Sequence, residues 1–390
     1  MYDDVRIVGV GETDYSSDSG RSELALAVHA IRAAADEAGI DVREIDGLCT
    51  YVQDTNPEIE VARTLGMRQL RFHARAQYGG GDCCSTVMHA AMAIQCGVAD
   101  TVAVFRAFNE RSGFRYGGGY SGLVPEPDAD HAQYSWGLPM GLFNAAGWIG
   151  MIARRYMHET GATSEDFGRV SVTSRAHAAT NPRARFHNRT ITMEDHQSSR
   201  LIVEPLRLLD CCLETDGGTA LILTRADRSS DCRGPAVPIL GAAQGVGFNQ
   251  HLLMQYYRPD MLDFDELRVV REQLWNQSGL GADDVDTAIL YDHFTPFVLI
   301  QLEGWGFCGR GEAAAMVRDG ATGLGGHLPV NPHGGQLGEA YMHGMNGIVE
   351  AVRQARGDAC NQVTGAQVVL ATGAPALATS ALLLGTPDAG

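Results

Sequence analysis

The 390-residue sequence contains no lysine, so all 30 of its basic residues are arginine. A Schiff-base mechanism needs a lysine amine. The chain is therefore not expected to act as an imine-forming aldolase or a pyridoxal enzyme, unless the amino terminus substitutes for lysine. Positive charge is also scarce, because the formal net charge is −17 at pH 7. A surface of this sign repels a phosphate backbone, so nucleic acid is not an expected partner.

Long apolar runs and paired cysteine motifs are missing as well. No window approaches the roughly 18 uninterrupted apolar residues that a membrane span requires, and the start, MYDDVRIVGVGETDY, resembles no leader peptide. We therefore expect a cytoplasmic protein with no membrane partner. The nine cysteines include no C-x-x-C motif, so a zinc ribbon within this chain is not expected. Adjacent cysteines, at Cys83-Cys84 and Cys211-Cys212, are too close for ordinary disulfide geometry and are expected to be reduced.

The chain contains an internal duplication. The spacing G-[IL]-x4-[IV]-D follows a helical pattern twice, at Gly39 and at Gly279, and each time it precedes a strand-like segment, GLCTY or TAILY. Each strand then runs into a helix with a proline near its start, Pro57 in the first copy and Pro296 in the second. Both of these helices end just before a glycine. Proline early and glycine late are the usual boundaries of a helix, so both copies predict the same succession of elements.

Each copy continues through a glycine loop. The run Gly79-Gly80-Gly81 opens a helix that leads into the strand DTVAVFRAF, and Gly334-Gly335 opens a segment that leads into the helix 348–355 and QVVLAT. Each half therefore reads helix, strand, helix, glycine loop, helix, strand, an alternation that predicts an α/β sheet flanked by helices. We place the halves at residues 1–235 and 236–390, with the boundary in the proline-containing RGPAVPI segment.

A long insertion, at about residues 111–204, interrupts the first half. It begins with the glycine-rich GFRYGGGYSGLVPEPDAD and later contains NPRARFHNRT. Insertions of this length are usually functional or form a binding lid. The segment that follows, PLRLLDCCLETDGGTALILTRA, is expected to close the first half as a turn and an apolar strand.

Several segments together resemble the thiolase superfamily, and within it the sterol-carrier-type thiolases and lipid-transfer proteins. They are IDGLCTY, AIQCGVADTVAV, PLRLLDCCLETDGGTALIL, YDHFTP, and NPHGG followed by GEAYMHGMNG, and they span essentially the whole chain. The resemblance implies a duplicated five-layer αβαβα thiolase fold, in agreement with the internal repeat. It also implies a homodimeric core.

The positions that carry cysteine in thiolases differ here. By ungapped counting, the nucleophilic cysteine of the family corresponds to Gly80, and the second family cysteine corresponds to Ala371, two residues before Gly373. Cys83 and Cys84 lie about one turn into the helix that follows Gly80. Without a thiolate no acyl-enzyme can form, so thiolysis and condensation by the usual route are not expected.

Two other catalytic positions of the family carry tyrosine. Tyr341 stands where the resemblance places the histidine of the glycine-rich loop, and Tyr291 stands at the first position of the Asn-Glu-Ala-Phe or His-Asp-Cys-Phe motif. Although a lone tyrosine is more often a packing residue, their joint appearance favours an acid/base pair, with the two roles unassigned. Asp292 is a candidate for tuning this pair or for capping a loop, and His343 is a further catalytic candidate.

The resemblance extends to retro-aldolases that shorten steroid side chains. It implies cleavage of a steroid β-hydroxyacyl-CoA to a ring ketone and a short acyl-CoA such as propionyl-CoA. The reaction needs a base for the β-hydroxyl, an oxyanion site for the enolate, and an acid for the α-carbon. By resemblance, the Gly373 backbone N–H belongs to the oxyanion site, and Gly80 and His293 are expected to border the substrate.

The same relatives work with a small OB-fold and zinc-ribbon protein. The resemblance therefore implies a heterotetramer in which zinc is held only by the partner. No cofactor is expected in this chain, since CoA is part of the substrate.

Three alternatives remain open from the sequence. The chain is a divergent thiolase or acyltransferase that uses Cys83 or Cys84, a non-catalytic acyl-CoA or lipid carrier, or a metal-dependent aldolase. The last would draw on acidic and histidine residues that gather in the final third of the chain but match no metal motif, so no metal site is predicted: Asp292, His293, His327, His333 and His343.

Overall fold

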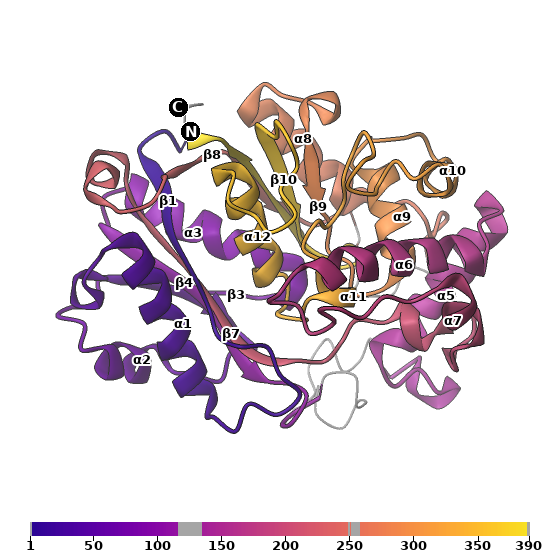
Figure 1. Ribbon diagram of the computed structural model, residues 1–390, viewed down its shortest axis with the longest axis horizontal. Coiled ribbons are helices and arrows are strands. Elements are labelled where there is room, and N and C mark those ends of the chain that lie inside the picture. Colours follow the sequence, from indigo (N-terminus) through magenta and orange to yellow (C-terminus); the bar gives the residue numbers. More distant parts are fainter. Residues whose placement is uncertain (1, 116–134, 249, 251–257, 388–390) are drawn as a thin grey trace.

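The computed structural model describes residues 2–115, 135–248, 250 and 258–387 (Figure 1). In these residues nine strands form one sheet in the order β3-β2-β4-β7-β1-β8-β11-β10-β9. The first half supplies β1 (Val5–Glu12), β2 (Gly47–Tyr51), β3 (Phe72–Ala76), β4 (Thr101–Asn109) and β7 (Asp216–Arg225). The second half supplies β8 (Val237–Gly245), β9 (Thr287–Ile289), β10 (Val368–Thr372) and β11 (Thr379–Gly385). A separate hairpin joins β5 (Leu201–Val203) to β6 (Leu206–Arg207).

The two halves repeat the same strand connections. In the first half β1 is antiparallel to β7, β7 is antiparallel to β4, and β4, β2 and β3 run parallel. In the second half β8 is antiparallel to β11, β11 is antiparallel to β10, and β10 is parallel to β9. A parallel bridge between Ala288 and Val330 takes the place of the β2–β3 pairing. The structure thus confirms the duplication predicted from the sequence.

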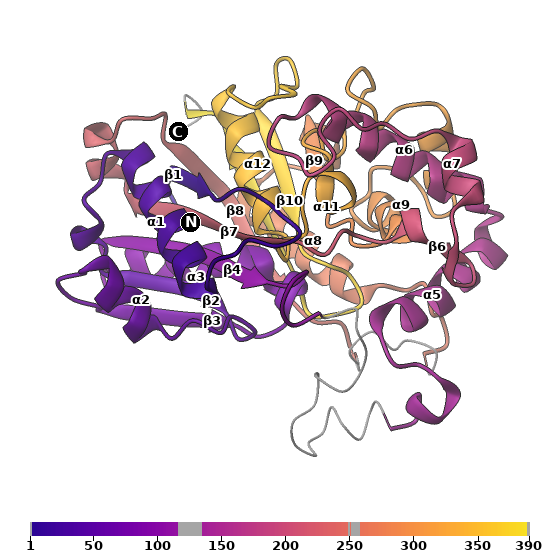
Figure 2. The ribbon, with the colours of Figure 1, turned by 60° about the horizontal axis from the view of Figure 1, so that its bottom comes forward.

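Helices and the two halves of the sheet alternate in five layers (Figure 1 and Figure 2). The outer helices α1 (Glu23–Ala38) and α2 (Glu58–Leu65) lie on the first half, and α8 (Asp265–Ser278) and α9 (Thr295–Gly304) lie on the second. The helices α3 (Cys83–Gln95) and α12 (Met345–Arg356) contact strands of both halves. They fill the layer between the two sheet halves, so the predicted αβαβα arrangement is confirmed.

Local sequence signals account for several boundaries. Ser22 caps α1 by accepting a hydrogen bond from the Ala25 N–H, and Gly39 ends that helix with φ of 75°. The strand β9 is shorter than the predicted TAILY, because Leu290 and Tyr291 leave the ladder. The Leu290 carbonyl accepts from the Asn331 side chain, and the Tyr291 N–H donates to Thr372 Oγ1 at 3.1 Å. This early exit lets the Tyr291 side chain leave the sheet for the molecular interior.

The inserted segment belongs to the first half but packs against the second (Figure 1). It forms α5 (Ala145–Thr160), α6 (Ser164–Thr180) and α7 (Met193–Ser198), and α6 contacts α9, α10 (Ala313–Arg318) and α11 (Gly335–Gly338). Most of the glycine-rich part expected to form a lid, at 116–134, lies outside the described residues. The proposed boundary near residue 235 lies just before β8 and stays a prediction. No helix among the described residues is long and apolar enough to cross a membrane.

Candidate active site

The two tyrosines predicted from the sequence meet inside the protein. Tyr291 follows β9, Tyr341 follows α11, and the two hydroxyl oxygens lie 3.3 Å apart in a hydrogen bond. Both side chains are buried, at 3% and 9% exposure. The loops of the second half thus bring together two phenols that are fifty residues apart in the chain. Their catalytic roles stay a prediction.

Gly80 leaves the space that the Tyr291 hydroxyl occupies. A Cβ atom built on Gly80 would lie 1.9 Å from Tyr291 Oη and 2.2 Å from Cζ, distances that no real contact allows. Gly344 packs on the ring from another side, because its Cβ would lie 3.0 Å from Tyr291 Cδ2. The position that carries the cysteine nucleophile in thiolases is therefore filled by a phenol that comes from the other half of the molecule.

The cysteines near this position are poor candidates for a nucleophile. Cys83 and Cys84 are fully buried in the first turn of α3. The Cys84 thiol donates to the Ala371 carbonyl at 3.4 Å, and burial raises the pKa of Cys84 well above its ordinary value. Because the reactive species is the thiolate, the buried Cys84 thiol does not support the divergent-thiolase alternative.

Burial also controls the ionisation of Tyr291. It raises the pKa of this phenol well above its usual value, and the neighbouring Tyr341 raises it further. Tyr291 is consequently protonated at neutral pH. It can therefore donate its proton to a basic group that develops next to it during the reaction.

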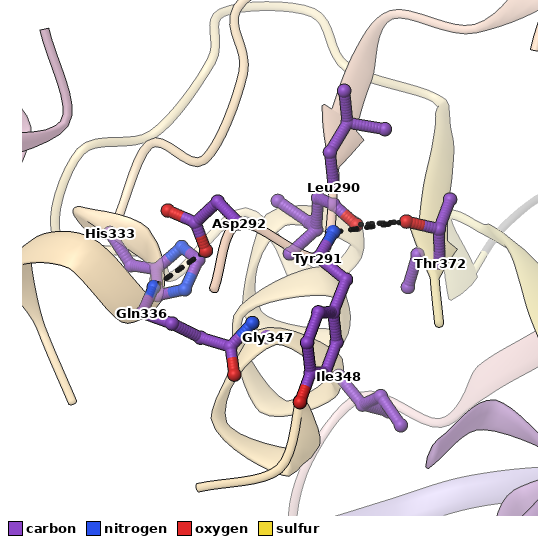
Figure 3. Close-up of a pocket in the computed structure, with 11 residues that line it drawn as sticks. Leu290, Tyr291, Asp292, His333, Gln336, Gly347, Ile348 and Thr372 are labelled. Carbon is purple, nitrogen blue, oxygen red and sulfur yellow. Dashed lines mark hydrogen bonds between the residues drawn. The ribbon is translucent and has the colours of Figure 1, made fainter. Parts of the chain in front are cut away.

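Asp292 points away from the Tyr291 side chain, because successive side chains on extended backbone face opposite sides (Figure 3). Its carboxylate accepts hydrogen bonds from the N–H groups of Gln336, at 2.7 Å, and Leu337, at 3.4 Å, at the start of α11. A Cβ on Gly335 would lie 2.0 Å from Asp292 Oδ2. Burial raises the pKa of Asp292 to about 6. Of the two roles considered for Asp292, the geometry supports the loop cap.

A small internal pocket borders Tyr291 and Asp292, with room for about one water molecule (Figure 3). Its lining includes the side chains of His333 and Gln336. Among the described residues, neither amide atom of Gln336 has a hydrogen-bond partner, and neither does His333 Nδ1. The pocket is polar enough to hold a bound water but far too small for an acyl-CoA.

The two histidines of the site are neutral. The His293 ring lies edge-on to Tyr291 with centroids 4.9 Å apart, and burial lowers the pKa of His293 to about 3. The His343 ring lies edge-on to Tyr341 at 5.2 Å, and burial followed by the charge of Arg106 lowers the pKa of His343 well below its usual value. Both imidazoles therefore line the phenol pair without positive charge at pH 7.

Comparison with known proteins identifies the family. Residues 249–385 match the family model described as thiolase C-terminal domain-like. The chain is 55% identical to a steroid side-chain-cleaving aldolase of Thermomonospora curvata, over 97% of each chain. It is 54% identical to the 17-hydroxy-3-oxo-4-pregnene-20-carboxyl-CoA lyase of Mycobacterium tuberculosis, over 97% of this chain and 98% of the relative. This chain belongs to the steroid side-chain-cleaving aldolases of the thiolase superfamily.

A solved structure supports the same assignment over the whole fold. The Ltp2-ChsH2(DUF35) aldolase superposes with a TM-score of 0.94 and 53% identity, over 99% of this chain and 98% of the other. The chain is thus a carbon–carbon lyase with the thiolase fold, as the sequence resemblance predicted. The tyrosine pair in place of the cysteine fits an aldolase, which needs proton transfer rather than an acyl-enzyme.

Gly373 requires a correction. Its backbone N–H was expected to help form the oxyanion site of the aldolase, but that N–H donates to the Ser380 carbonyl at 2.7 Å. The reason is that the backbone pairing of β10 with β11 extends one residue beyond Thr372. The glycine itself serves close packing, because a Cβ there would lie 2.0 Å from the Gly81 carbonyl oxygen. In this structure the Gly373 N–H is therefore engaged within the sheet.

The sequence interpretation also missed Arg106. This residue lies in β4 at 1% exposure and forms an ion pair with Asp54, whose carboxylate is also buried. Its Nε donates to His343 Nδ1 at 3.2 Å. The signal was present in the predicted strand DTVAVFRAF, where a single charge interrupts an apolar run. A charged residue on a fully buried strand has a partner or a function.

Metal ligands are not assembled in the part of the chain that the structure describes. Within it no group of three or more His, Cys, Asp or Glu side chains is arranged to hold a metal ion. Two of the five residues considered for a metal-dependent aldolase have other partners: Asp292 caps α11, and His333 lies 3.7 Å from Glu339.

Proposed function

We propose that this aldolase cleaves a steroid β-hydroxyacyl-CoA by a retro-aldol reaction, giving a ring ketone and a short acyl-CoA. The observation that carries the proposal is the buried Tyr291–Tyr341 pair in the space of the lost cysteine. The family membership narrows the substrate class. One relative is named for a 17-hydroxy pregnene-20-carboxyl-CoA, a thioester whose hydroxyl is on the β-carbon. Cleavage of its bond between the α- and β-carbons would leave a 17-ketone and propionyl-CoA.

The two phenols fit complementary roles. In the reaction a base removes the β-hydroxyl proton, the carbon–carbon bond breaks, and its electron pair moves onto the thioester oxygen as an enolate. An acid then protonates the α-carbon. The raised pKa of Tyr291 suits the acid. We assign the base to Tyr341, because a hydrogen bond from Tyr291 would stabilise the Tyr341 phenolate.

A partner protein is part of the proposal. The closely similar solved aldolase is named as an Ltp2-ChsH2(DUF35) assembly. We propose that this chain likewise joins an OB-fold and zinc-ribbon protein, with a homodimeric core, a heterotetrameric complex and zinc held by the partner alone. We also propose that the complex acts in the cytoplasm. The pocket beside Tyr291 has room for only about one water, and we propose that the partner helps to open the site to the substrate.

The test is to co-express the chain with a DUF35 partner and to supply a steroid β-hydroxyacyl-CoA. We expect equal amounts of ring ketone and short acyl-CoA by mass spectrometry, with no requirement for free CoA. Products that appear only when free CoA is added would return the chain to the thiolases. Tight binding without turnover in the complex would favour the carrier alternative.

A further inference from the structure

Arg106 and Asp54 form a buried ion pair behind the tyrosine site. Arg106 Nη1 donates to Asp54 Oδ2 at 2.9 Å, and the two side chains are 1% and 0% exposed. Asp54 also accepts hydrogen bonds from the N–H of Ala107 and from the backbone and side chain of Asn56. Burial of two charges is costly unless all their hydrogen bonds are made. These hydrogen bonds hold the pair in place, so Arg106 can orient the side chain that it contacts on its other side, His343.

Arg106 determines which nitrogen of His343 carries the proton. Arg106 Nε donates to His343 Nδ1 at 3.2 Å. A guanidinium group has only donors, so His343 Nδ1 must be the acceptor. A neutral imidazole has one protonated nitrogen, and in His343 this must be Nε2. The proton lies on the edge of the ring opposite Arg106.

The orientation of the His343 ring is fixed as firmly as its tautomer. The ring stacks on Phe108 with centroids 5.3 Å apart and planes 15° from parallel, and Arg106 Cζ lies 4.2 Å from the centre of the same Phe108 ring. The backbone of His343 has φ of 51°, which is uncommon for a residue other than glycine, and its carbonyl accepts from Tyr51 Oη. Strained backbone of this kind persists where the surroundings hold it, typically at functional sites.

The groups around His343 also prevent it from gaining a second proton. Among the groups that the structure describes, the cation of Arg106 faces the Nδ1 atom, and the rings of Tyr51 and Tyr341 lie beside the imidazole. The charges of Arg106 and His293 both lower the pKa of His343. The only lone pair of the ring is directed at a cation. His343 therefore donates a hydrogen bond but neither accepts nor releases a proton during turnover.

We infer that Asp54 and Arg106 are positioning residues that keep His343 neutral and protonated at Nε2, so that His343 donates a hydrogen bond to the thioester oxygen of the substrate. The inference rests on the proposed retro-aldol reaction. The electron pair of the broken bond moves onto that oxygen, and the Nε2–H stabilises the charge without transferring its proton. This supplies the donor that Gly373 does not, since its N–H is engaged with Ser380.

The first experiment measures the tautomer without any turnover. The full chain is labelled with nitrogen-15 in its histidines, and the His343 signals are identified by their loss in His343→Gly, a substitution that tolerates the positive φ. We expect an unprotonated Nδ1 and a protonated Nε2 that do not change between pH 5.5 and 8.5. Protonation of Nδ1, or titration of the ring in this range, would overturn the inference. This readout stands even if the proposed reaction proves wrong.

The second experiment tests the positioning role in the complex with its partner. The double variant Arg106→Met/Asp54→Asn removes both charges, so that no buried carboxylate is left unpaired. We expect kcat to fall at least about tenfold and the pH–rate profile to gain an ionisation on its acidic side, below the ordinary histidine pKa of about 6.5 because burial still lowers the pKa of His343. That ionisation should disappear when His343→Gly is added. Arg106→Lys retains a donor and should recover part of the rate.

Two controls complete the test. The Arg318–Asp166 pair joins α10 to α6, and its neutral counterpart Arg318→Met/Asp166→Asn should leave the pH–rate profile unchanged. His343→Gly alone should lower kcat by about a hundredfold, the usual effect of removing an oxyanion donor, without adding an ionisation. Wild-type kcat in a folded His343→Gly enzyme would overturn the donor role, and an unchanged profile in the Arg106 double variant would overturn the positioning role.

Discussion

The two halves of this aldolase contain equivalent glycine loops, but only one of them carries reactive side chains. In the first half the Gly79–Asp82 turn leaves room at Gly80 for the Tyr291 hydroxyl of the second half. In the second half the loops after β9 and α11 supply Tyr291, Tyr341 and His343. A duplicated fold thus permits a division of labour in which one copy contributes the phenols and the other gives up a side chain to make room for them. The absence of a side chain at Gly80 and the buried position of Tyr291 therefore depend on each other.

The largest expected effect comes from returning a side chain to the empty loop. In Gly80→Cys the new Cβ would lie 1.9 Å from Tyr291 Oη, so the phenol must move. We expect at least a hundredfold loss of kcat and a loss of stability of about 1–3 kcal/mol from overpacking. The variant should not gain thiolysis, because the second cysteine and the histidine of the thiolases are still missing, with Ala371 and Tyr341 at those positions. Activity assays and urea unfolding measure both effects.

Gly325→Ala is the matched control, because a Cβ there meets nothing within 4 Å. It should behave like the wild type. If Gly80→Cys also retains most of its activity, then Tyr291 does not need the space beside Gly80, and the division of labour between the halves is wrong.

The next largest effect is expected when only the hydroxyl groups of Tyr291 and Tyr341 are removed. Tyr291→Phe and Tyr341→Phe should each lower kcat by about a hundredfold or more, since general acid or base catalysis contributes this much. The double variant should lose less than the product of the single losses if the pair acts as a unit. Substrate affinity should change little because the rings remain.

Tyr156→Phe is the control for the tyrosine variants. Its hydroxyl is bonded to Glu303 in a separate core, so its loss should affect stability and not kcat. Nearly full turnover in either Tyr291→Phe or Tyr341→Phe would make that residue a packing side chain.

The sequence predicted the repeat, the pairing of the two tyrosines and a glycine in place of the family's cysteine, because each depends on local spacing that matches the family pattern. It did not predict what the Gly373 N–H or the Asp292 carboxylate bonds to. Those partners, Ser380 and Gln336, are chosen by how strands and loops close in three dimensions. Arg106 was missed for the same reason, since its partners Asp54 and His343 come from distant segments.

A smaller effect, on the pH dependence of stability, is expected from the buried carboxyl groups beside the two glycine loops, Asp82 and Asp292. Burial raises the pKa of Asp82 in the first half and of Asp292 in the second from 3.8 to about 6. An acid whose pKa is raised by folding stabilises the native state below its unfolded pKa, and this contribution is lost as the pH rises to about 6. As the pH rises from 4 to 6, the stability of Asp82→Asn and Asp292→Asn should therefore increase relative to that of the wild type.

The gain should be at most about 3 kcal/mol for each variant, since each pKa unit corresponds to about 1.4 kcal/mol. Urea unfolding at pH 4 and pH 6.5 measures it. Asp195→Asn on the surface is the comparison, because the pKa of Asp195 is lowered from 3.8, so its contribution to stability changes only below about pH 4 and should stay constant over this range. A stability difference between Asp292→Asn and wild type that is independent of pH would mean that the carboxylate is fully compensated by its cap.

The smallest expected effect belongs to the cysteines beside the empty loop. Cys83 and Cys84 are buried in the first turn of α3, and the raised pKa of Cys84 keeps that thiol protonated. Cys83→Ala and Cys84→Ala should therefore leave retro-aldol turnover near the wild-type rate, at a cost of about 1 kcal/mol in stability. Thiol alkylation of the native complex should likewise have little effect, since both thiols are fully buried. Complete loss of turnover in the two variants, with folding intact, would mean that a cysteine thiolate of the first half is the catalytic group.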